Sequence, residues 1–216
     1  MIRTLLLDLD GTLVNTVPDL TAALNRLMRS RDFAEFTQPE TALMVGDGVA
    51  KLIERAFAAR GCCPDPEAVR DFSVDYGSHA AVDSQPYPGV VAGLGALIGD
   101  GWRLGVCTNK PEAAARSLLV ALGLDSCFGA IGGGDSFPVR KPDPRHLLAT
   151  LEAAGGCHER ALMGGDHAND VAAASGAGVP CIFAAWGYGP PEMAAGAVAV
   201  AQNFQELIEI ARRLLD

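Results

Sequence analysis

The amino-acid sequence predicts an α/β fold, a doubly wound, Rossmann-like parallel sheet with a small helical segment inserted after its first strand. The chain opens with an apolar run over residues 5–7, which has the length of a strand buried on both faces. From about Asn15 to Tyr87 only helical patterns follow. After Tyr87, strand-like runs alternate with helices through short connections, as in the βαβ units of a parallel sheet.

Composition and charge limit the classes of protein to which the chain can belong. Its 216 residues, 49% of them hydrophobic, are enough to bury a core in one large domain or in a large and a small one. The net charge of -9 and the lack of a basic cluster argue against a nucleic acid or an anionic membrane as a partner.

The expected compartment follows from the apolar runs and the cysteines. No apolar run has the length of a membrane span, and Arg3, Asp8 and Asp10 interrupt the region where a signal peptide needs apolar residues. The six cysteines form no C-x-x-C pair, which favours reduced thiols over a metal or disulfide framework. We therefore expect a cytoplasmic protein, either a monomer or a homodimer.

The first strand delivers two acidic residues, Asp8 and Asp10, to a turn at Gly11. Side chains two positions apart on a strand point the same way, and glycine lets the backbone turn. Two neighbouring carboxylates repel each other, which raises one pKa or requires a cation between them. The pair indicates a metal site, an acid/base pair, or both; taken alone, an ordinary strand-to-loop turn explains it as well.

The remaining elements are expected from apolar periodicity and from helix-capping residues. In the inserted segment we expect helices over residues 17–30, 49–60 and 67–81. After it we expect a helix over 88–98, a strand over 102–107, a helix over 111–122, a strand over 128–131, a helix from 143 to the glycines at 155 and 156, a strand over 160–163, a helix over 171–175, a strand over 181–185 and a helix over 204–215. Residues 193–201 read as an Ala-rich surface stretch.

Polar residues follow these strands, at the sheet edge where ligands of such folds bind. Thr108 and Asn109 offer a hydroxyl and free N–H groups to a phosphate, although a plain helix N-cap explains them too. Lys141 lies at the same edge, where an acidic cluster requires a cation. Asp166 and Asp170 are hard oxygen ligands suited to Mg²⁺, unless Asp170 only charges a helix N-terminus.

Four loops thus carry Asp-x-Asp-Gly-Thr, Thr-Asn, Lys-Pro and Gly-Asp-x-x-x-Asp, in that order after successive strands. Together these motifs span essentially the whole chain and resemble those of haloacid dehalogenase superfamily phosphatases. The resemblance implies an α/β core domain over residues 1–14 and 87–216, and a small, mobile helical cap domain over residues 15–86. It also implies Mg²⁺-dependent hydrolysis of a small anionic phosphomonoester.

The resemblance assigns a catalytic role to each acidic motif residue. Asp8 is the expected nucleophile, which becomes an aspartyl phosphate. Asp10 is expected to protonate the leaving alkoxide and then to activate water. The expected ligands of Mg²⁺ are Asp8, the backbone carbonyl of Asp10, and Asp166, with Asp170 in support.

The resemblance also names the residues that hold the substrate phosphate. Thr108, the N–H of Asn109 and Lys141 would bind the equatorial oxygens, which carry charge in the transition state. Gly11, in the turn after the first strand, is expected to line the substrate site.

Several runs resemble bacterial phosphoglycolate phosphatases most closely, namely residues 86–90, 107–111, 134–136 and 140–144. In the inserted segment, Gly46, Asp47 and Gly48, followed by Lys51, resemble the Gly-x-Gly cap motif of that group. Glycine N–H groups, with Lys51 or Arg55 nearby, would bind a small carboxylate, although a plain turn and helix start explains the loop almost as well. The expected substrate is therefore 2-phosphoglycolate.

Two departures and two alternatives accompany this interpretation. Asn15 stands where related enzymes usually carry an acid, and His167 where they usually carry Ser, which bears on substrate fit more than on chemistry. One alternative is a phosphatase of another small sugar or nucleotide phosphate. The other is a non-catalytic binding protein on the same fold, against which the intact motif residues argue.

Overall fold

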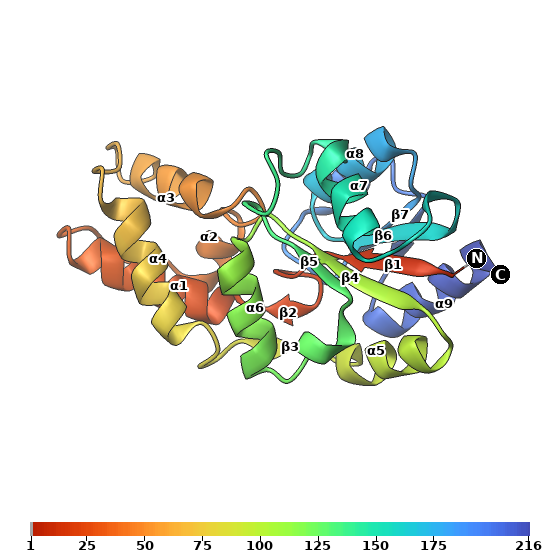
Figure 1. The fold of residues 1–216 in the computed structure, drawn as a ribbon. Coiled ribbons are helices and arrows are strands. Elements are labelled where there is room, and N and C mark those ends of the chain that lie inside the picture. The colour runs from red at the N-terminus through yellow and green to blue at the C-terminus, as the bar shows by residue number, and fades with distance from the viewer. Residues whose placement is uncertain (1) are drawn as a thin grey trace.

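The computed structural model describes residues 2–216, and its centre is a six-stranded sheet of parallel strands (Figure 1). The strand order is β5-β4-β1-β6-β7-β8. In chain order the strands are β1 (Thr4–Leu7), β4 (Arg103–Cys107), β5 (Ala130–Gly132), β6 (Ala161–Gly165), β7 (Cys181–Ala184) and β8 (Ala199–Ala201). The chain builds one half of the sheet outward from β1 and then the other half from β6, which confirms the doubly wound α/β fold.

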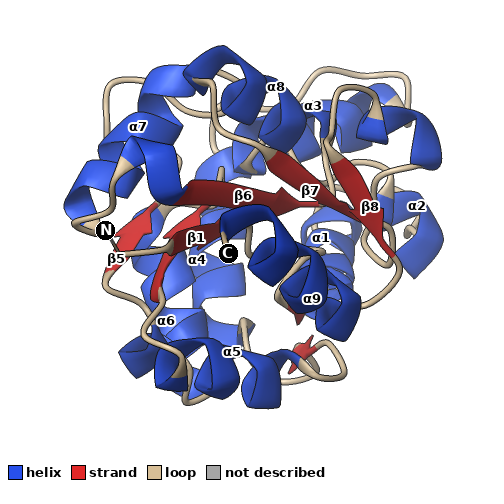
Figure 2. Ribbon diagram, turned by 90° about the vertical axis from the view of Figure 1, so that its right-hand side faces the viewer, coloured by secondary structure: helices blue, strands red, loops and turns tan. Residues whose placement is uncertain are grey.

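Helices cover both faces of the sheet, as Figure 2 shows. On one face lie α5 (Val90–Gly99), α6 (Glu112–Ala121) and α9 (Phe204–Leu215), and on the other α7 (Pro144–Ala153) and α8 (Ala168–Ala177). Leu5 and Leu7 of β1 pack toward the first set of helices, whereas Leu6 packs toward the second. Burial on both faces explains why β1 reads as a continuous apolar run instead of an alternating one.

The carboxyl ends of the three central strands meet at one edge of the sheet. Leu7, the last residue of β1, pairs with Val106 of β4 and with Gly164 of β6. The segments that follow these three strands therefore start side by side, although they lie far apart in the sequence. These are the segments in which the sequence places its acidic and phosphate-binding residues.

The segment between β1 and α5 forms a separate layer of helices beside that edge (Figure 1). It contains α1 (Val17–Arg29), α2 (Gln38–Ala42), α3 (Val49–Ala58) and α4 (Ala68–His79). The apolar faces of α1, α3 and α4 meet in a hydrophobic cluster of their own, in which Phe57 and Phe72 are fully enclosed. None of the helices in residues 2–216 is both long enough and apolar enough to cross a membrane.

The expectation that no strand lies between residues 15 and 87 was wrong in one place. Val14–Asn15 (β2) and Gln85–Pro86 (β3) form a short antiparallel pair, in which Val14 faces Pro86 and Asn15 faces Gln85. Strands of two residues have too little periodicity to be recognised, and their pairing depends on a partner some seventy positions away. The pair holds together the two chain crossings that lead into and out of the helical layer.

Three further elements differ from the expected pattern. Helix α2 was not expected, although its capping box, in which Thr37 and Glu40 bond each other's backbone N–H groups, is a signal that sequence can carry. Strand β8 lies in the Ala-rich stretch that was read as surface, because pairing with β7 decides its conformation. Helix α8 begins at Ala168, three residues earlier than expected.

Asp19 joins the first turn of α1 to the chain that leaves the helical layer. Its carboxylate is 3% exposed and accepts hydrogen bonds from the backbone N–H groups of Val82 (3.1 Å), Asp83 (3.0 Å) and Ser84 (2.9 Å). The Ser84 hydroxyl donates to the same carboxylate at 2.6 Å. One buried side chain therefore accepts hydrogen bonds from three consecutive backbone N–H groups in the segment that leads out of the helical layer.

Replacing this carboxylate is expected to lower stability. Asp19→Ala leaves several buried donors without an acceptor, so the free energy of unfolding should fall by about 3 kcal/mol. Asp83→Ala, which removes an exposed carboxylate from the same crossing, should change it by less than about 0.5 kcal/mol. Urea unfolding followed by circular dichroism measures both, and equal effects of the two variants would contradict this role of Asp19.

Candidate active site

Three buried aspartates meet where β1 and β6 end. Asp8 follows β1 directly, and its backbone N–H donates to the carbonyl of Gly164 at 2.9 Å. Asp166 follows β6, and Asp170 lies in the first turn of α8. Carboxylate oxygens of the three residues lie within 4.8 Å of one another. The structure thus brings together three of the acidic residues that the sequence singled out.

Asp166 and Asp170 are both held by hydrogen bonds from several directions. Asp166 accepts from the Thr12 hydroxyl at 2.7 Å and from the backbone N–H of Tyr188 at 2.8 Å. Asp170 accepts from the Lys141 ammonium at 2.5 Å and from the backbone N–H of His167 at 2.9 Å. These bonds fix the orientation of each carboxylate.

Burial and mutual repulsion make it unfavourable for all three carboxylates of this cluster to be ionised. Loss of hydration, followed by repulsion from Asp8 and Asp170, raises the pKa of Asp166 to about 8. Loss of hydration also raises the pKa of Asp170 to about 6, against the attraction of Lys141. The ammonium of Lys141 lies 2.9 Å from Asp8 and bonds the Cys107 carbonyl at 2.5 Å. Its burial opposes the charged form, but Asp170 and Asp8 raise the Lys141 pKa above its ordinary value.

The cluster fits a hard divalent cation. Oδ1 of Asp8 is buried, and its one charged partner among the described residues is the Lys141 ammonium at 2.9 Å, while three carboxylates offer oxygens within 4.8 Å of one another. Such an oxygen set suits Mg²⁺, whose charge would offset the loss of hydration and the repulsion that raise the two pKa values. Gly11 borders this cluster with a φ of +88°, and a Cβ at this position would overlap the carboxylate of Asp166. Glycine is therefore required here for two reasons.

Asp10 lies beside the cluster and pairs with a lysine that the sequence analysis did not select. The Lys110 ammonium lies 3.1 Å from Oδ1 and 3.3 Å from Oδ2 of Asp10, and donates to the Tyr76 hydroxyl at 2.9 Å. Lys110 is buried, and attraction to Asp10 keeps its pKa above the ordinary value in spite of that burial. This contact joins the sheet edge to α4 of the helical layer.

Thr108 and Asn109 follow β4 and lie at the same edge. Both are buried, and the Thr108 hydroxyl accepts from the backbone N–H of Lys110 at 3.2 Å. The Asn109 amide donates to the carbonyls of Gly46 and Lys141, each at 3.0 Å. The side chain of Asn109 thus contacts the loop before α3, a role that its motif did not suggest.

The loop before α3 is held against the sheet edge by core residues. The Asn169 amide donates to Asp47 at 2.6 Å and to the Gly46 carbonyl at 3.3 Å. Gly46 has a φ of +117°, and a Cβ there would overlap the ring of His167. Asp47 also forms an ion pair with Arg55. The position of His167, which had no expected role, is explained by this packing and by its N-cap bond from Asn169.

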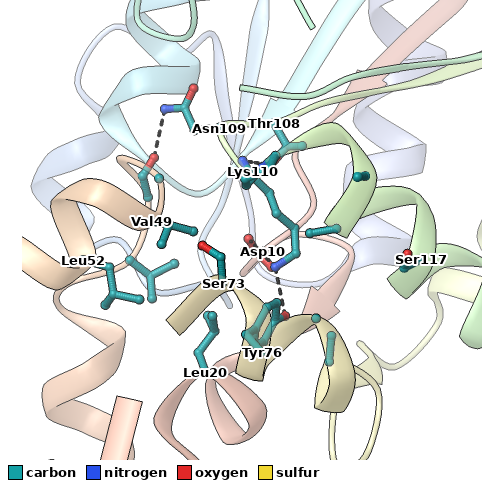
Figure 3. A pocket seen from close by; sticks show the side chains of 18 of the residues that line it. Asp10, Leu20, Val49, Leu52, Ser73, Tyr76, Thr108, Asn109, Lys110 and Ser117 are labelled. Carbon is teal, nitrogen blue, oxygen red and sulfur yellow. Dashed lines mark hydrogen bonds and ion pairs between the residues drawn. The ribbon is translucent and has the colours of Figure 1, made fainter. Parts of the chain in front are cut away.

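A cavity of about 310 Å³ lies between this loop, α1, α4 and the sheet edge (Figure 3). Asp8, Asp10, Thr108, Asn109 and Lys110 line its core side. Gly46 and Gly48 line the opposite side together with apolar and small residues, which are Leu20, Val45, Val49, Leu52, Ser73, Gly77 and Ala80. Four of the expected substrate-binding residues are not among the lining residues, namely Gly11, Asp47, Lys51 and Lys141.

Lys51 is an expected site residue that the structure places outside the cavity wall. Its ammonium pairs with Glu54 one helical turn away at 2.6 Å, and its side chain is 47% exposed. Conversely, Thr12, Tyr76, Lys110, Asn169 and Tyr188 contact the site residues but were not selected from the sequence. Lys110 and Thr12 directly adjoin motif residues, whereas Tyr76 and Tyr188 are brought in only by the tertiary fold.

Comparison with known proteins agrees with this arrangement. The family model for the haloacid dehalogenase-like hydrolases matches residues 2–178. A phosphoglycolate phosphatase from Rhodospirillum rubrum is 42% identical over 216 residues, which cover 96% of this chain and 90% of the relative. One from Agrobacterium fabrum is 45% identical over 186 residues, which cover 84% of this chain and 79% of the relative.

Solved structures share the whole architecture. A predicted phosphoglycolate phosphatase from Haemophilus somnus 129PT superposes with a TM-score of 0.89 at 29% identity, covering 97% of both chains. CbbY from Rhodobacter sphaeroides in complex with phosphate superposes with a TM-score of 0.81 at 26% identity, covering 96% of both chains. A mutant of CbbY in complex with xylulose-(1,5)bisphosphate gives a TM-score of 0.80 at 25% identity, with the same coverage.

The aspartate cluster predicts stabilisation by Mg²⁺. At about 100 times its dissociation constant, the cation should add about 2.7 kcal/mol to the free energy of unfolding. For a chain of this length, that raises the Tm by about 5 to 10 °C. Thermal melts with Mg²⁺ and with EDTA measure the difference. Asp166→Asn should lose most of it and Glu192→Gln, which alters an exposed carboxylate, none of it; an unchanged response of Asp166→Asn would place the cation elsewhere.

Proposed function

The chain belongs to the haloacid dehalogenase-like hydrolases and is a phosphomonoesterase, and we propose that it hydrolyses 2-phosphoglycolate to glycolate and phosphate in a Mg²⁺-dependent reaction. The observation that carries this proposal is the buried cluster of Asp8, Asp166 and Asp170, with Asp10 beside it at the mouth of a cavity. The substrate is proposed because curated relatives at about 40% identity are named phosphoglycolate phosphatases.

We assign residues 1–14 and 87–216 to the catalytic core and residues 15–86 to a cap. The separate hydrophobic cluster of the helical layer supports this division, as does the β2–β3 pair where the chain crosses between the two parts. The bonds from Asn109 and Asn169 to the loop before α3 correspond to a closed cap. A closed cap surrounds the reacting phosphate and excludes bulk water.

In the proposed first step, a carboxylate oxygen of Asp8 attacks phosphorus and the bond to the leaving oxygen breaks. Thr108, the N–H of Asn109 and Lys141 bind the oxygens of the transferring phosphoryl group, on which charge is spread. Asp10, which is protonated at the start of this step, gives its proton to the leaving glycolate oxygen. The products of this step are glycolate and an aspartyl phosphate on Asp8.

In the proposed second step, water hydrolyses the aspartyl phosphate. Asp10, now ionised, removes a proton from the water, which attacks phosphorus and releases phosphate from Asp8. Asp8, Asp166 and Asp170 would hold Mg²⁺ with the backbone carbonyl of Asp10. The bound cation would neutralise the charge of the phosphate and of the carboxylates, which otherwise repel each other.

A screen for released phosphate over small phosphomonoesters tests the substrate. We expect kcat/KM for 2-phosphoglycolate to exceed that for sugar phosphates and nucleotides by about 100-fold or more, because a buried anion site discriminates strongly. Asp8→Asn and the EDTA-treated protein should show background rates. If the protein hydrolyses another phosphate ester faster in a Mg²⁺-dependent reaction, the proposed substrate is wrong and the proposed chemistry stands. If it hydrolyses none of the esters, the result favours the non-catalytic alternative.

Asp10→Asn tests the two-step reaction. p-Nitrophenolate leaves without help from an acid, so this variant should still phosphorylate itself, whereas its hydrolytic step should be roughly 10² to 10⁴-fold slower. The expected result is a burst of p-nitrophenolate equal to the amount of enzyme and a mass increase of one phosphoryl group. A slow release without a burst would contradict a covalent intermediate on Asp8.

A further inference from the structure

The cavity contains a single basic side chain among the described residues that line it, and this is Lys110. The other charged residues in its wall are Asp8 and Asp10, so an anion entering the cavity meets one favourable side chain and two unfavourable ones. Figure 3 shows Lys110 reaching from the core side toward Asp10 and Tyr76. The proposed chemistry of the phosphoryl group gives Lys110 no task.

Three nearby cations outside the cavity wall already have partners, whereas Arg140, which lies beside Gly48, is exposed to solvent. Lys141 contacts Asp8, Asp170 and a backbone carbonyl, and it serves the phosphoryl group. Arg55 pairs with Asp47 and donates to the Met44 carbonyl. Lys51 pairs with Glu54 on the outer side of α3 and is about half exposed. Lys110 also has partners, Asp10 and Tyr76, but it is the one cation among the described residues that line the cavity, which makes it the best placed to receive a second anionic group of a substrate.

We propose that Lys110 binds the carboxylate of the substrate and thereby selects phosphate esters with an acidic group next to the ester oxygen. This inference rests on the proposed function, and it assigns the carboxylate to the core side of the cavity instead of to Lys51. Its basis is the placement of an enclosed ammonium within 3.1 Å of Asp10, the residue that contacts the leaving oxygen.

The covalent structure of the substrate fits this placement. In 2-phosphoglycolate, a single methylene group separates the ester oxygen from the carboxylate. When Asp10 contacts the ester oxygen, the carboxylate must therefore lie within a few ångströms of Asp10, where the Lys110 ammonium is found. Tyr76 accepts a hydrogen bond from Lys110, so its own O–H group can donate to the same carboxylate.

The cap side of the cavity makes this ion pair selective. The side chains of Leu20, Val45, Val49 and Leu52 offer no donor to an anion, and their apolar surroundings strengthen an ion pair that forms beside them. A neutral group in the same position would leave Lys110 without the additional partner. We therefore expect selection by charge as well as by size.

The experiment compares two nearly isosteric esters, 2-phosphoglycolate and carbamoylmethyl phosphate, in which an amide replaces the carboxylate. The readout is the ratio of their kcat/KM values. If a variant only misplaces Asp10, both kcat/KM values fall by the same factor and the ratio does not change. Wild type should favour the carboxylate. Lys110→Met should lower the ratio by about 30-fold or more. Lys110→Gln, which keeps a hydrogen-bond donor, should lower it similarly, and Lys110→Arg should largely preserve it.

Each other outcome has a definite meaning. An unchanged ratio in Lys110→Met and Lys110→Gln, with both rates reduced, would overturn the inference and leave Lys110 as a positioning residue for Asp10. A fall of the ratio in Lys51→Met instead would place the carboxylate at the cap loop. A wild-type ratio near one would overturn both the inference and the proposed substrate, whereas absence of any turnover in wild type would overturn the proposed function itself. Thermal melts confirm that each variant is folded.

Discussion

The mutual repulsion of three buried carboxylates is the constraint on which the rest of the site depends. Asp8, Asp166 and Asp170 are drawn together by the parallel register of β1 and β6, and their charges oppose that arrangement. Lys141 compensates part of the charge, and the bonds from Thr12 and Tyr188 keep Asp166 in place. A cluster of this kind favours a bound cation, whose positive charge offsets the repulsion among the carboxylates.

Contacts across the cavity join the helical layer to this cluster through very few residues. Asn109 and Asn169 hold the loop before α3, and Lys110 bonds Tyr76 of α4. Each of the three core residues is adjacent in sequence, or nearly so, to a residue of the catalytic machinery. The residues that contact the helical layer and the acidic residues at the sheet edge therefore belong to the same short segments.

Much of the fold and the catalytic part of the site could be predicted from the sequence. A buried parallel strand that ends in Asp8 and Asp10 has a local signature, because the apolar run and the polar turn are both contiguous. The β2–β3 pair, strand β8 and the contacts of Tyr76 and Tyr188 have no such signature, since each depends on residues distant in the chain. Lys51 shows the opposite case: its charge beside a glycine loop suggested a ligand, whereas in the structure its ammonium pairs with Glu54.

The β2–β3 pair has a consequence for how such a protein evolves. The chain crosses to the helical layer and back at two adjacent points. The segment between Asn15 and Gln85 therefore leaves and rejoins the rest of the chain at the β2–β3 pair. Insertions, deletions or replacement of that segment leave the distance between its two ends, at β2 and β3, unchanged. They therefore do not disturb the register of the six-stranded sheet. During evolution the helical segment can therefore change while the sheet and its aspartates are kept. Any change in the residues that face the cavity would then alter which leaving group is recognised.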